Sequence, residues 1–306
     1  MGNPPGTDNY EKYMVFVDNL AEVSGGLLTI EVFAGGVLAS DAEALDALLN
    51  GSVDFVHLHA GTAVQAVKDV AIMSLFGTFK YKDDNDLTSF VDFEHALHDT
   101  FEDIYADYGI KYLRLAQANQ AVLVCRDMQI KSPADMKNKL WRTSGSYQGR
   151  VIEAWGAAAT NVSMADLPSS LERGTVEGTI TAYGASASFK LYEVAPYTTY
   201  TQYTDGISSL AMSMDSWNSL TPQEQDWVQE AAEYYLINAQ GVGKEWYDRI
   251  MKELTDYGTN IYELTNDEHQ AFLDLVDPIK AEVYGECSDK GKKLMDQIEA
   301  WQKANR

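Results

Sequence analysis

Apolar positions recur with a helical period in several parts of the chain. The clearest stripe lies within residues 86–108, where five apolar side chains from Phe90 to Ile104 are three or four residues apart. This spacing predicts an amphipathic helix. A longer stripe runs from Trp227 to Leu254 and follows a capping sequence that begins at Thr221. A helix of about thirty residues spans about 50 Å, so we expect it to lie across two lobes.

Short apolar runs alternate with shorter helical patterns in the first and the middle part of the chain. In the first part, the pattern predicts strands at 27–33 and 53–59 and helices at 10–21, 40–49 and 62–70. In the middle part, it predicts a β-like run at 139–143, helices at 147–156 and 165–173, and strands at 159–164 and 176–182. Strand–helix alternation at this spacing predicts parallel βαβ units in doubly wound sheets.

Two further stretches, 110–126 and 192–214, have the pattern of extended chain without a helical period. A chain of 306 residues is longer than one compact core usually serves. The sequence contains neither internal repeats nor a linker rich in Pro and Gly. We therefore expect two lobes, with the polypeptide crossing from one to the other at each of these two extended stretches, rather than two domains in series.

Composition changes this picture mainly through charge. The formal net charge is −23, which argues against nucleic acid or an anionic membrane surface as a partner. An anionic ligand would then need a local positive site against an unfavourable overall field. The two cysteines, Cys125 and Cys287, are too few for a disulfide scaffold, and they either form one bridge or remain separate thiols.

Motifs for catalysis or cofactor binding are absent from the sequence. It has no nucleophile elbow, phosphate-binding loop or dinucleotide fingerprint. His57 and His59 lie on one face of the strand predicted at 53–59, but a third metal ligand at a suitable spacing is missing. We expect no enzyme activity, no cofactor and no metal.

Four motifs in the middle of the chain carry a family resemblance. They are Ser132–Arg142, the tripeptide Trp155-Gly156-Ala157, the segment Ala165–Gly178 and the tripeptide Ile180-Thr181-Ala182. Together they resemble the solute-binding proteins of TRAP (tripartite ATP-independent periplasmic) transporters, and the resemblance extends more loosely over nearly the whole chain. It implies an α/β protein with the two-lobed, type II-like periplasmic binding fold, in which doubly wound sheets are joined by crossing strands and a long bridging helix. We expect residues 1–121 and 207–253 in lobe I, and 122–206 and 254–306 in lobe II.

The resemblance also implies a role for Arg142, because the arginine at this place in the motif holds the ligand's carboxylate. A guanidinium offers a planar fork of donors that matches a carboxylate. Without the motif, a surface ion pair would be the simpler interpretation. Thr181 occupies the place of the family's asparagine, so a single hydroxyl replaces an amide and Tyr183 is expected to share its task.

Other candidate ligand contacts have a structural alternative. Met164 stands where an aromatic ring often packs on the ligand, and His59 aligns with a strand end that lines the cleft in relatives. Further candidates are Tyr147 and Trp141 as ring-stacking side chains, Asn9 with Asn3, Thr7 and Asp8 at the rim of the first lobe, and Phe76 and Trp217. Core packing explains Phe76 and Trp217 equally well, and it explains Met164 nearly as well.

The function implied is capture of a small organic acid between the lobes and its delivery to the TRAP membrane permease. Met164, Tyr147 and the missing amide at Thr181 favour a monocarboxylate with an apolar or aromatic body. We expect a periplasmic monomer whose signal peptide has been removed or omitted and whose first strand is clipped. The alternatives are the sensor domain of a receptor and a hydrolase that uses an acidic pair.

Overall fold

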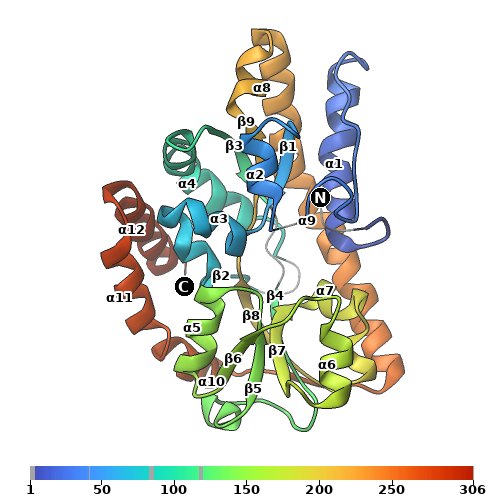
Figure 1. The fold of residues 1–306 in the computed structure, drawn as a ribbon, viewed down its shortest axis with the longest axis vertical. Helices are drawn as coiled ribbons and strands as arrows, with labels where there is room; N and C mark the ends of the chain where they lie inside the picture. The colour runs from blue at the N-terminus through green and yellow to red at the C-terminus, as the bar shows by residue number, and fades with distance from the viewer. Residues whose placement is uncertain (1–3, 41, 83–85, 117–119, 306) are drawn as a thin grey trace.

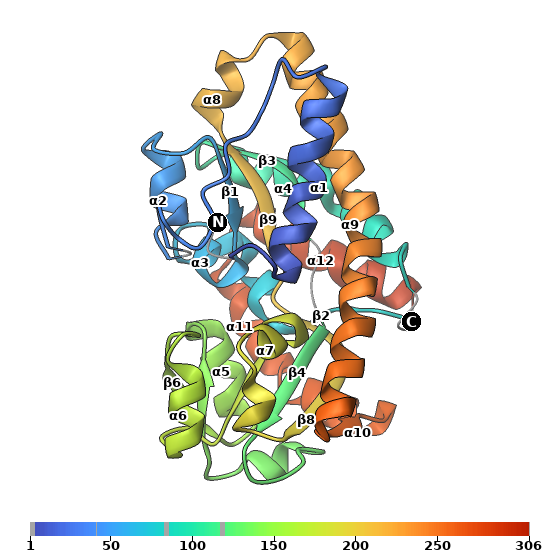
Figure 2. The same cartoon turned by 90° about the vertical axis from the view of Figure 1, so that its right-hand side faces the viewer.

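The computed structural model describes residues 4–40, 42–82, 86–116 and 120–305. It has an upper lobe and a lower lobe, joined by a long helix along one side (Figures 1 and 2). Among the described residues, no helix is both long enough and apolar enough to cross a membrane. The two-lobed α/β fold expected from the resemblance is confirmed.

The first lobe is built on a sheet with strand order β1-β9-β3. Its strands are β1 (Phe55–Leu58), β3 (Ile110–Leu115) and β9 (Ser209–Ser213), and β9 is antiparallel to both neighbours. The helices of this lobe are α1 (Asp8–Val23), α2 (Ala44–Leu49), α3 (Ala60–Ala66), the 3-10 helix η1 (Lys68–Ser74), α4 (Ser89–Ala106) and α8 (Met214–Ser219).

The second lobe holds a larger mixed sheet with the order β10-β8-β4-β7-β5-β6. The strands are β4 (Gln120–Cys125), β5 (Leu140–Thr143), β6 (Ala158–Asn161), β7 (Gly178–Ala182), β8 (Tyr197–Asp205) and β10 (Asn260–Glu263), and β2 (Phe76–Lys80) also pairs with β8. Strand β5 is parallel to β6 and to β7, as the strand–helix alternation predicted. The helices beside this sheet are η2 (Pro133–Met136), α5 (Ser146–Ala154), α6 (Leu167–Arg173), α7 (Tyr183–Ser188), η3 (Leu191–Glu193) and α10 (Asn266–Asp274).

Both predicted crossings between the lobes are confirmed. The chain passes from β3 in the first sheet to β4 in the second, and returns from β8 in the second sheet to β9 in the first. Helix α9 (Pro222–Tyr257) begins with the predicted capping box at Thr221 and packs against α1 of the first lobe and α7 and β10 of the second. One helix therefore touches both lobes over its length (Figure 2).

The expected residue boundaries of the lobes remain a prediction, and the C-terminal helices bear on it. Helix α11 (Asp277–Glu286) contacts η1, and α12 (Asp289–Ala304) packs on α4 and η1. These contacts lie with the first lobe, whereas residues 254–306 were expected in the second. Packing therefore favours a division in which α12 belongs to lobe I.

Two predicted strands differ from the structure. Residues 27–33 form no strand, because no described strand lies beside them to provide a ladder. The first sheet consequently lacks the βαβα arrangement that was expected there. Strand β6 exists, but it is an edge strand with exposed ends and is not buried as predicted for 159–164. Cys125 and Cys287 are both free and buried.

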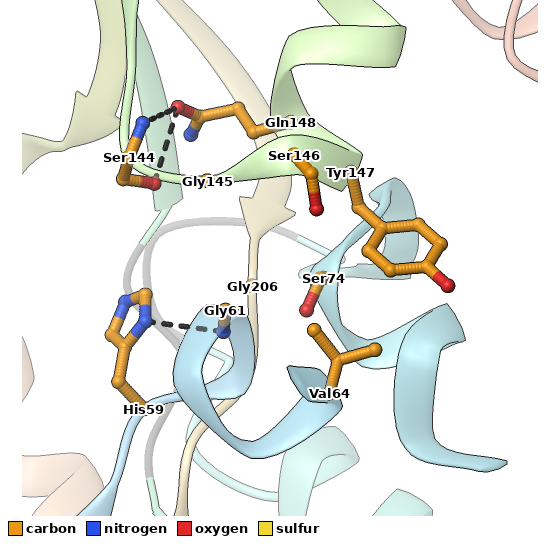
Figure 3. Close-up of a pocket in the computed structure, with 10 residues that line it drawn as sticks. All are labelled: His59, Gly61, Val64, Ser74, Ser144, Gly145, Ser146, Tyr147, Gln148 and Gly206. Carbon is orange, nitrogen blue, oxygen red and sulfur yellow. Dashed lines mark hydrogen bonds between the residues drawn. The ribbon is translucent and has the colours of Figure 1, made fainter. Parts of the chain in front are cut away.

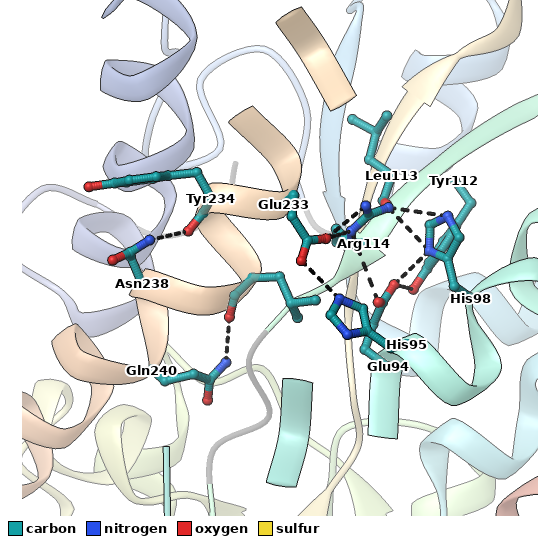
Figure 4. A network of polar contacts seen from close by, with 11 residues as sticks. Glu94, His95, His98, Tyr112, Leu113, Arg114, Glu233, Tyr234, Asn238 and Gln240 are labelled. Carbon is teal, nitrogen blue, oxygen red and sulfur yellow. Dashed lines mark hydrogen bonds and ion pairs between the residues drawn. The ribbon is translucent and has the colours of Figure 1, made fainter. Parts of the chain in front are cut away.

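A buried polar network ties α4, β3 and α9 together on the side of the first lobe (Figure 4). The Glu94 carboxylate is fully buried and accepts a hydrogen bond from the Tyr112 hydroxyl at 2.8 Å. Arg114 from β3 forms an ion pair of 2.8 Å with Glu233 of α9. Because these charges are paired in a poorly solvated place, they fix the bridging helix to the first lobe.

Candidate functional site

Arg142 lies near the carboxyl end of β5, a strand with a parallel neighbour on each side. Its strand β5 sits between β6 and β7, and Arg142 pairs in register with Thr160 and Thr179. The side chain is only 6% exposed, and its Nε donates a hydrogen bond to the carbonyl oxygen of Val162 at 2.9 Å. The carboxyl ends of parallel strands are where α/β proteins bind ligands. A positioned, buried guanidinium at this place suits an anion.

Thr181 and Tyr183 are supplied by the neighbouring strand. Thr181 lies near the end of β7, opposite Val122 of β4, and is 5% exposed. Tyr183 begins α7, and its hydroxyl donates to the carbonyl oxygen of Gly243 in α9 at 3.0 Å. Burial, and then the nearby Asp8 charge, raise the pKa of Tyr183 well above its usual value. Tyr183 therefore remains a protonated donor at ordinary pH.

Met164 comes from the third neighbouring strand end. It follows β6 and is partly buried against an apolar cluster of the second lobe that includes Leu167 and Leu171. Arg142 in β5, Thr181 in β7 and Met164, which follows β6, thus lie at the carboxyl ends of three strands of one sheet. This packing leaves both interpretations of Met164, ligand contact and core, in place.

His59 faces the second lobe across a narrow cavity (Figure 3). It caps the amino end of α3, and its Nδ1 accepts a hydrogen bond from the Gly61 N–H at 3.2 Å. Opposite lie residues 144–148, which directly follow β5. The cavity measures only about 10 Å³, room for about one water molecule. The two lobes therefore lie close together at this seam.

Tyr147 lines the same cavity from α5. Its hydroxyl donates to the Glu286 carboxylate at 3.2 Å, and the Arg150 guanidinium lies over its ring. Burial, followed by the Glu286 charge, raises the pKa of Tyr147. The hydroxyl is therefore engaged with α11, and the side chain is partly buried against the largest core cluster.

An ion pair that the sequence analysis missed lies at the amino end of α1. Asp8 and Lys12 are 3.2 Å apart, and both are almost completely buried. The Asp8 carboxylate occupies the space where a Cβ on Gly184 of α7 would lie, so this pair reaches the second lobe next to Tyr183. Asn9 is in the same turn and is partly buried. A spacing of four residues on a helix was the available signal for the pair.

Three other candidates lie in apolar surroundings. Trp141 and Phe76 are fully buried in the largest core cluster, where Phe76 packs edge-on against Trp155. Trp217 is in α8 at the far end of the first lobe, with the Lys111 ammonium 4.7 Å from its ring centre. Trp141 and Phe76 therefore pack as core residues, and Trp217 is partly buried against an apolar cluster of the first lobe. Asn3 lies outside the described residues, and Thr7 is the residue before α1.

Comparison with known proteins gives a family match over most of the chain. The sequence pattern of the family described as "Bacterial extracellular solute-binding protein, family 7" matches residues 1–286. The ectoine-binding periplasmic protein TeaA of Halomonas elongata is 25% identical over 282 residues, covering 90% of this chain and 81% of that protein. The C4-dicarboxylate-binding protein DctB of Bacillus subtilis is 26% identical over 274 residues, covering 86% of this chain and 75% of that protein.

Solved structures show a similar fold. A TRAP periplasmic solute-binding protein from Chromohalobacter salexigens with bound D-glucuronate aligns with a TM-score of 0.86 at 23% identity, covering 99% of this chain and 98% of that one. The TeaA structure aligns with a TM-score of 0.88 at 22% identity, covering 99% and 97%. These likenesses establish the two-lobed architecture.

Proposed function

Because this chain belongs to family 7 of the bacterial extracellular solute-binding proteins, the solute-binding family of TRAP transporters, we propose that Arg142 binds the carboxylate of a small organic acid between the lobes. As a member of this family, the chain is a solute-binding protein and not an enzyme. The hydrolase alternative is therefore set aside.

The position of Arg142 is the observation that carries this proposal. Its Nε is held by the Val162 carbonyl, so the side chain has a fixed direction at the strand ends. A planar guanidinium that is oriented in advance binds a carboxylate with less loss of side-chain entropy than a flexible lysine. The overall charge of −23 makes such a local cation necessary for an anionic ligand.

The ligand class follows from the neighbours of Arg142. Thr181 contributes one hydroxyl, and Met164 contributes an apolar, adaptable surface. Relatives are named for binding ectoine and C4-dicarboxylates, and solved neighbours hold D-glucuronate and β-D-galacturonate. All these ligands carry a carboxylate. We propose a monocarboxylate with an apolar or aromatic body for this chain.

Capture requires a hinge motion. The seam between His59 and residues 144–148 leaves almost no free volume, so ligand enters an open form and the lobes then close over it. The closed form would dock on the TRAP membrane permease. We propose that the protein does this as a monomer in the periplasm, because the family acts outside the cytoplasm.

A thermal-shift screen followed by calorimetry tests the ligand site. The panel contains ectoine, D-glucuronate, D-galacturonate, succinate and benzoate, each with wild type, Arg142→Ala and Arg173→Ala. Arg173 is an exposed arginine of the same lobe and serves as the matched control. A ligand at one hundred times its Kd adds about 2.7 kcal/mol to stability. We expect shifts from carboxylates only, lost in Arg142→Ala and kept in Arg173→Ala.

Shifts that persist in Arg142→Ala would reject Arg142 as the carboxylate anchor. Uptake of the ligand by proteoliposomes that contain the permease then separates transport from sensing. Binding without any stimulation of uptake would favour the receptor alternative.

A further inference from the structure

Helix α11 carries the chain from the second lobe back to the first. It follows α10, which is tied to the second lobe because the Trp155 indole N–H donates to the Phe272 carbonyl oxygen at 3.0 Å. Its other end is fixed to η1 of the first lobe, where the Asp69 carboxylate accepts a hydrogen bond from the Ser288 N–H at 2.8 Å. The chain therefore passes between the lobes again at α11, after the crossings at β3–β4 and β8–β9.

Helix α5 of the second lobe lies beside α11, and polar side chains join the two helices (Figures 1 and 2). The Arg150 guanidinium forms an ion pair with Glu282 and a second one, at 3.6 Å, with Glu286. The Tyr147 hydroxyl donates to the same Glu286 carboxylate at 3.2 Å. We call these four residues the α5–α11 clasp. Glu286 lies only two residues before Ser288, so the clasp links α5 almost directly to the first lobe.

The clasp lies at the seam between the lobes. Tyr147 lines the seam cavity together with His59 of the first lobe (Figure 3). Helix α5 begins four residues after Arg142, and it also touches α3 and η1 of the first lobe. A movement of the lobes at the seam therefore changes the distance between α5 and η1, and the clasp spans this distance.

Of the two joints made by α11, the one with η1 is better protected from water. Asp69 is 8% exposed and Cys287 is 6% exposed, whereas the side chains of Glu282 and Glu286 are 65% and 49% exposed. Exposed ion pairs contribute little individually, and long side chains separate and pair again without disturbing a core. When the lobes move apart, we expect the clasp to open while the end of α11 stays attached to η1.

We propose that the α5–α11 clasp is a latch that stabilises the closed arrangement of the lobes before any ligand is bound. Its contacts form when α5 approaches α11 and break when the second lobe swings away. Because they are ionic and exposed, the latch is weak, and the protein still opens to admit a ligand. A more stable closed form also slows the release of a bound solute. The proposal rests on the hinge motion of the proposed function, but not on Arg142 or on the identity of the ligand.

The distance between the lobes in the ligand-free protein tests the latch. Nitroxide labels are attached through Asp46→Cys in α2 and Glu172→Cys in α6, two exposed positions in different lobes (Figure 2). The natural thiols of Cys125 and Cys287 are buried and react slowly with the label. Pulsed electron double resonance then gives the distribution of distances between the labels, and the ratio of the closed to the open population.

The variants reverse one charge of the clasp and then restore the pairing. Arg150→Glu places like charges next to Glu282 and Glu286, and Glu286→Arg combined with Arg150→Glu exchanges the two partners. Lys252→Glu is the matched control, because it makes the same charge change at an exposed ion pair within α9. We expect the closed-to-open ratio to fall about threefold in Arg150→Glu. It should return towards the wild-type value in the double variant and stay unchanged in Lys252→Glu.

Salt provides a second measurement that needs no further variant. In about 1 M NaCl, where the Debye length is about 3 Å, the difference between wild type and Arg150→Glu should shrink. Thermal unfolding of each variant checks that it is folded at the temperature of labelling.

An unchanged ratio in Arg150→Glu would overturn the latch, and so would a decrease that the double variant does not recover. A wild-type distribution without a closed population would overturn it as well. Failure of the carboxylate site is a different result, because it is seen as thermal shifts that persist in Arg142→Ala and leaves these distances as they are.

Discussion

The Tyr183 hydroxyl and the Gly243 carbonyl oxygen are 3.0 Å apart and form a hydrogen bond between α7 and the bridging helix α9. Tyr183 follows Thr181 by two residues, so this bond joins the proposed ligand segment to the helix that touches both lobes. Tyr183→Phe removes the donor and leaves the ring in place. We expect a loss of about 1 kcal/mol in the free energy of unfolding, measured by chemical denaturation. Tyr234→Phe removes a hydroxyl at an exposed position of α9 and should have no effect on the free energy of unfolding.

Arg142→Lys separates charge from geometry in the proposed site. Lysine keeps a positive charge but loses the planar fork and the hydrogen bond from Nε to Val162. We expect carboxylate affinity to fall by about 2 kcal/mol, roughly thirtyfold, because hydrogen bonds to charged groups contribute about this much. Calorimetry with the ligand found in the screen measures it. Unchanged affinity would mean that charge alone suffices at this position.

Gly184 and Gly241 predict opposite effects of the same substitution. A Cβ at Gly184 would collide with the buried Asp8 carboxylate, whereas a Cβ at Gly241 meets no atom within 4 Å. Gly184→Ala should therefore cost about 1–3 kcal/mol of stability. Gly241→Ala should add about 0.5–1 kcal/mol, since alanine is the better helix former. Thermal unfolding of both variants checks this, and destabilisation by both would contradict the geometry.

His269 predicts a loss of stability in mild acid. Burial, and then the positive charge of Lys80, lower the pKa of this imidazole to about 4 from 6.5. The unfolded chain therefore binds a proton between pH 6.5 and 4 that the folded protein does not. Stability should fall across this window as the pH decreases, by up to about 3 kcal/mol.

His269→Phe keeps an aromatic ring beside Tyr203 and removes this titration. Denaturation of wild type and variant at several pH values gives the difference, in which the titration of the shared carboxylates cancels. A difference that does not change between pH 7 and 4.5 would refute the assignment.

The buried Glu94 carboxylate should couple strongly to Tyr112 (Figure 4). Their hydrogen bond is 2.8 Å long, and burial followed by the Glu94 charge raises the pKa of Tyr112 well above its usual value. A double-mutant cycle with Glu94→Gln and Tyr112→Phe should give a coupling energy of about 2 kcal/mol. Additive effects would show that the bond contributes little to stability.

The helices could be predicted from sequence because their signals are local. The capping box at Thr221 involves residues only three apart, and α9 begins where the box places it. The apolar stripe between Phe90 and Ile104 likewise corresponds to the buried face of α4. Such patterns depend on neighbours along the chain, so one sequence suffices.

Strands and lobe contacts depend on distant residues. Residues 27–33 have the composition of a strand but no ladder beside them, so their propensity is not realised. The place of Arg142 followed from the motif around it. The burial of Lys12 could not be predicted from nearby residues, because it results from the contact of Asp8 with Gly184 on the other lobe.

The order of strands in the first sheet also constrains how the protein folds as it is synthesised. Strand β9 lies between β1 and β3, so their pairing cannot form until the ribosome has released residues 209–213. The whole chain of the second sheet up to β8 is made before then. The part of the second sheet from β4 to β8 can therefore pair earlier, without its edge strand β10, while β1 and β3 of the first sheet wait with unpaired edges. This is the long sequence separation that slows folding and favours protection by chaperones.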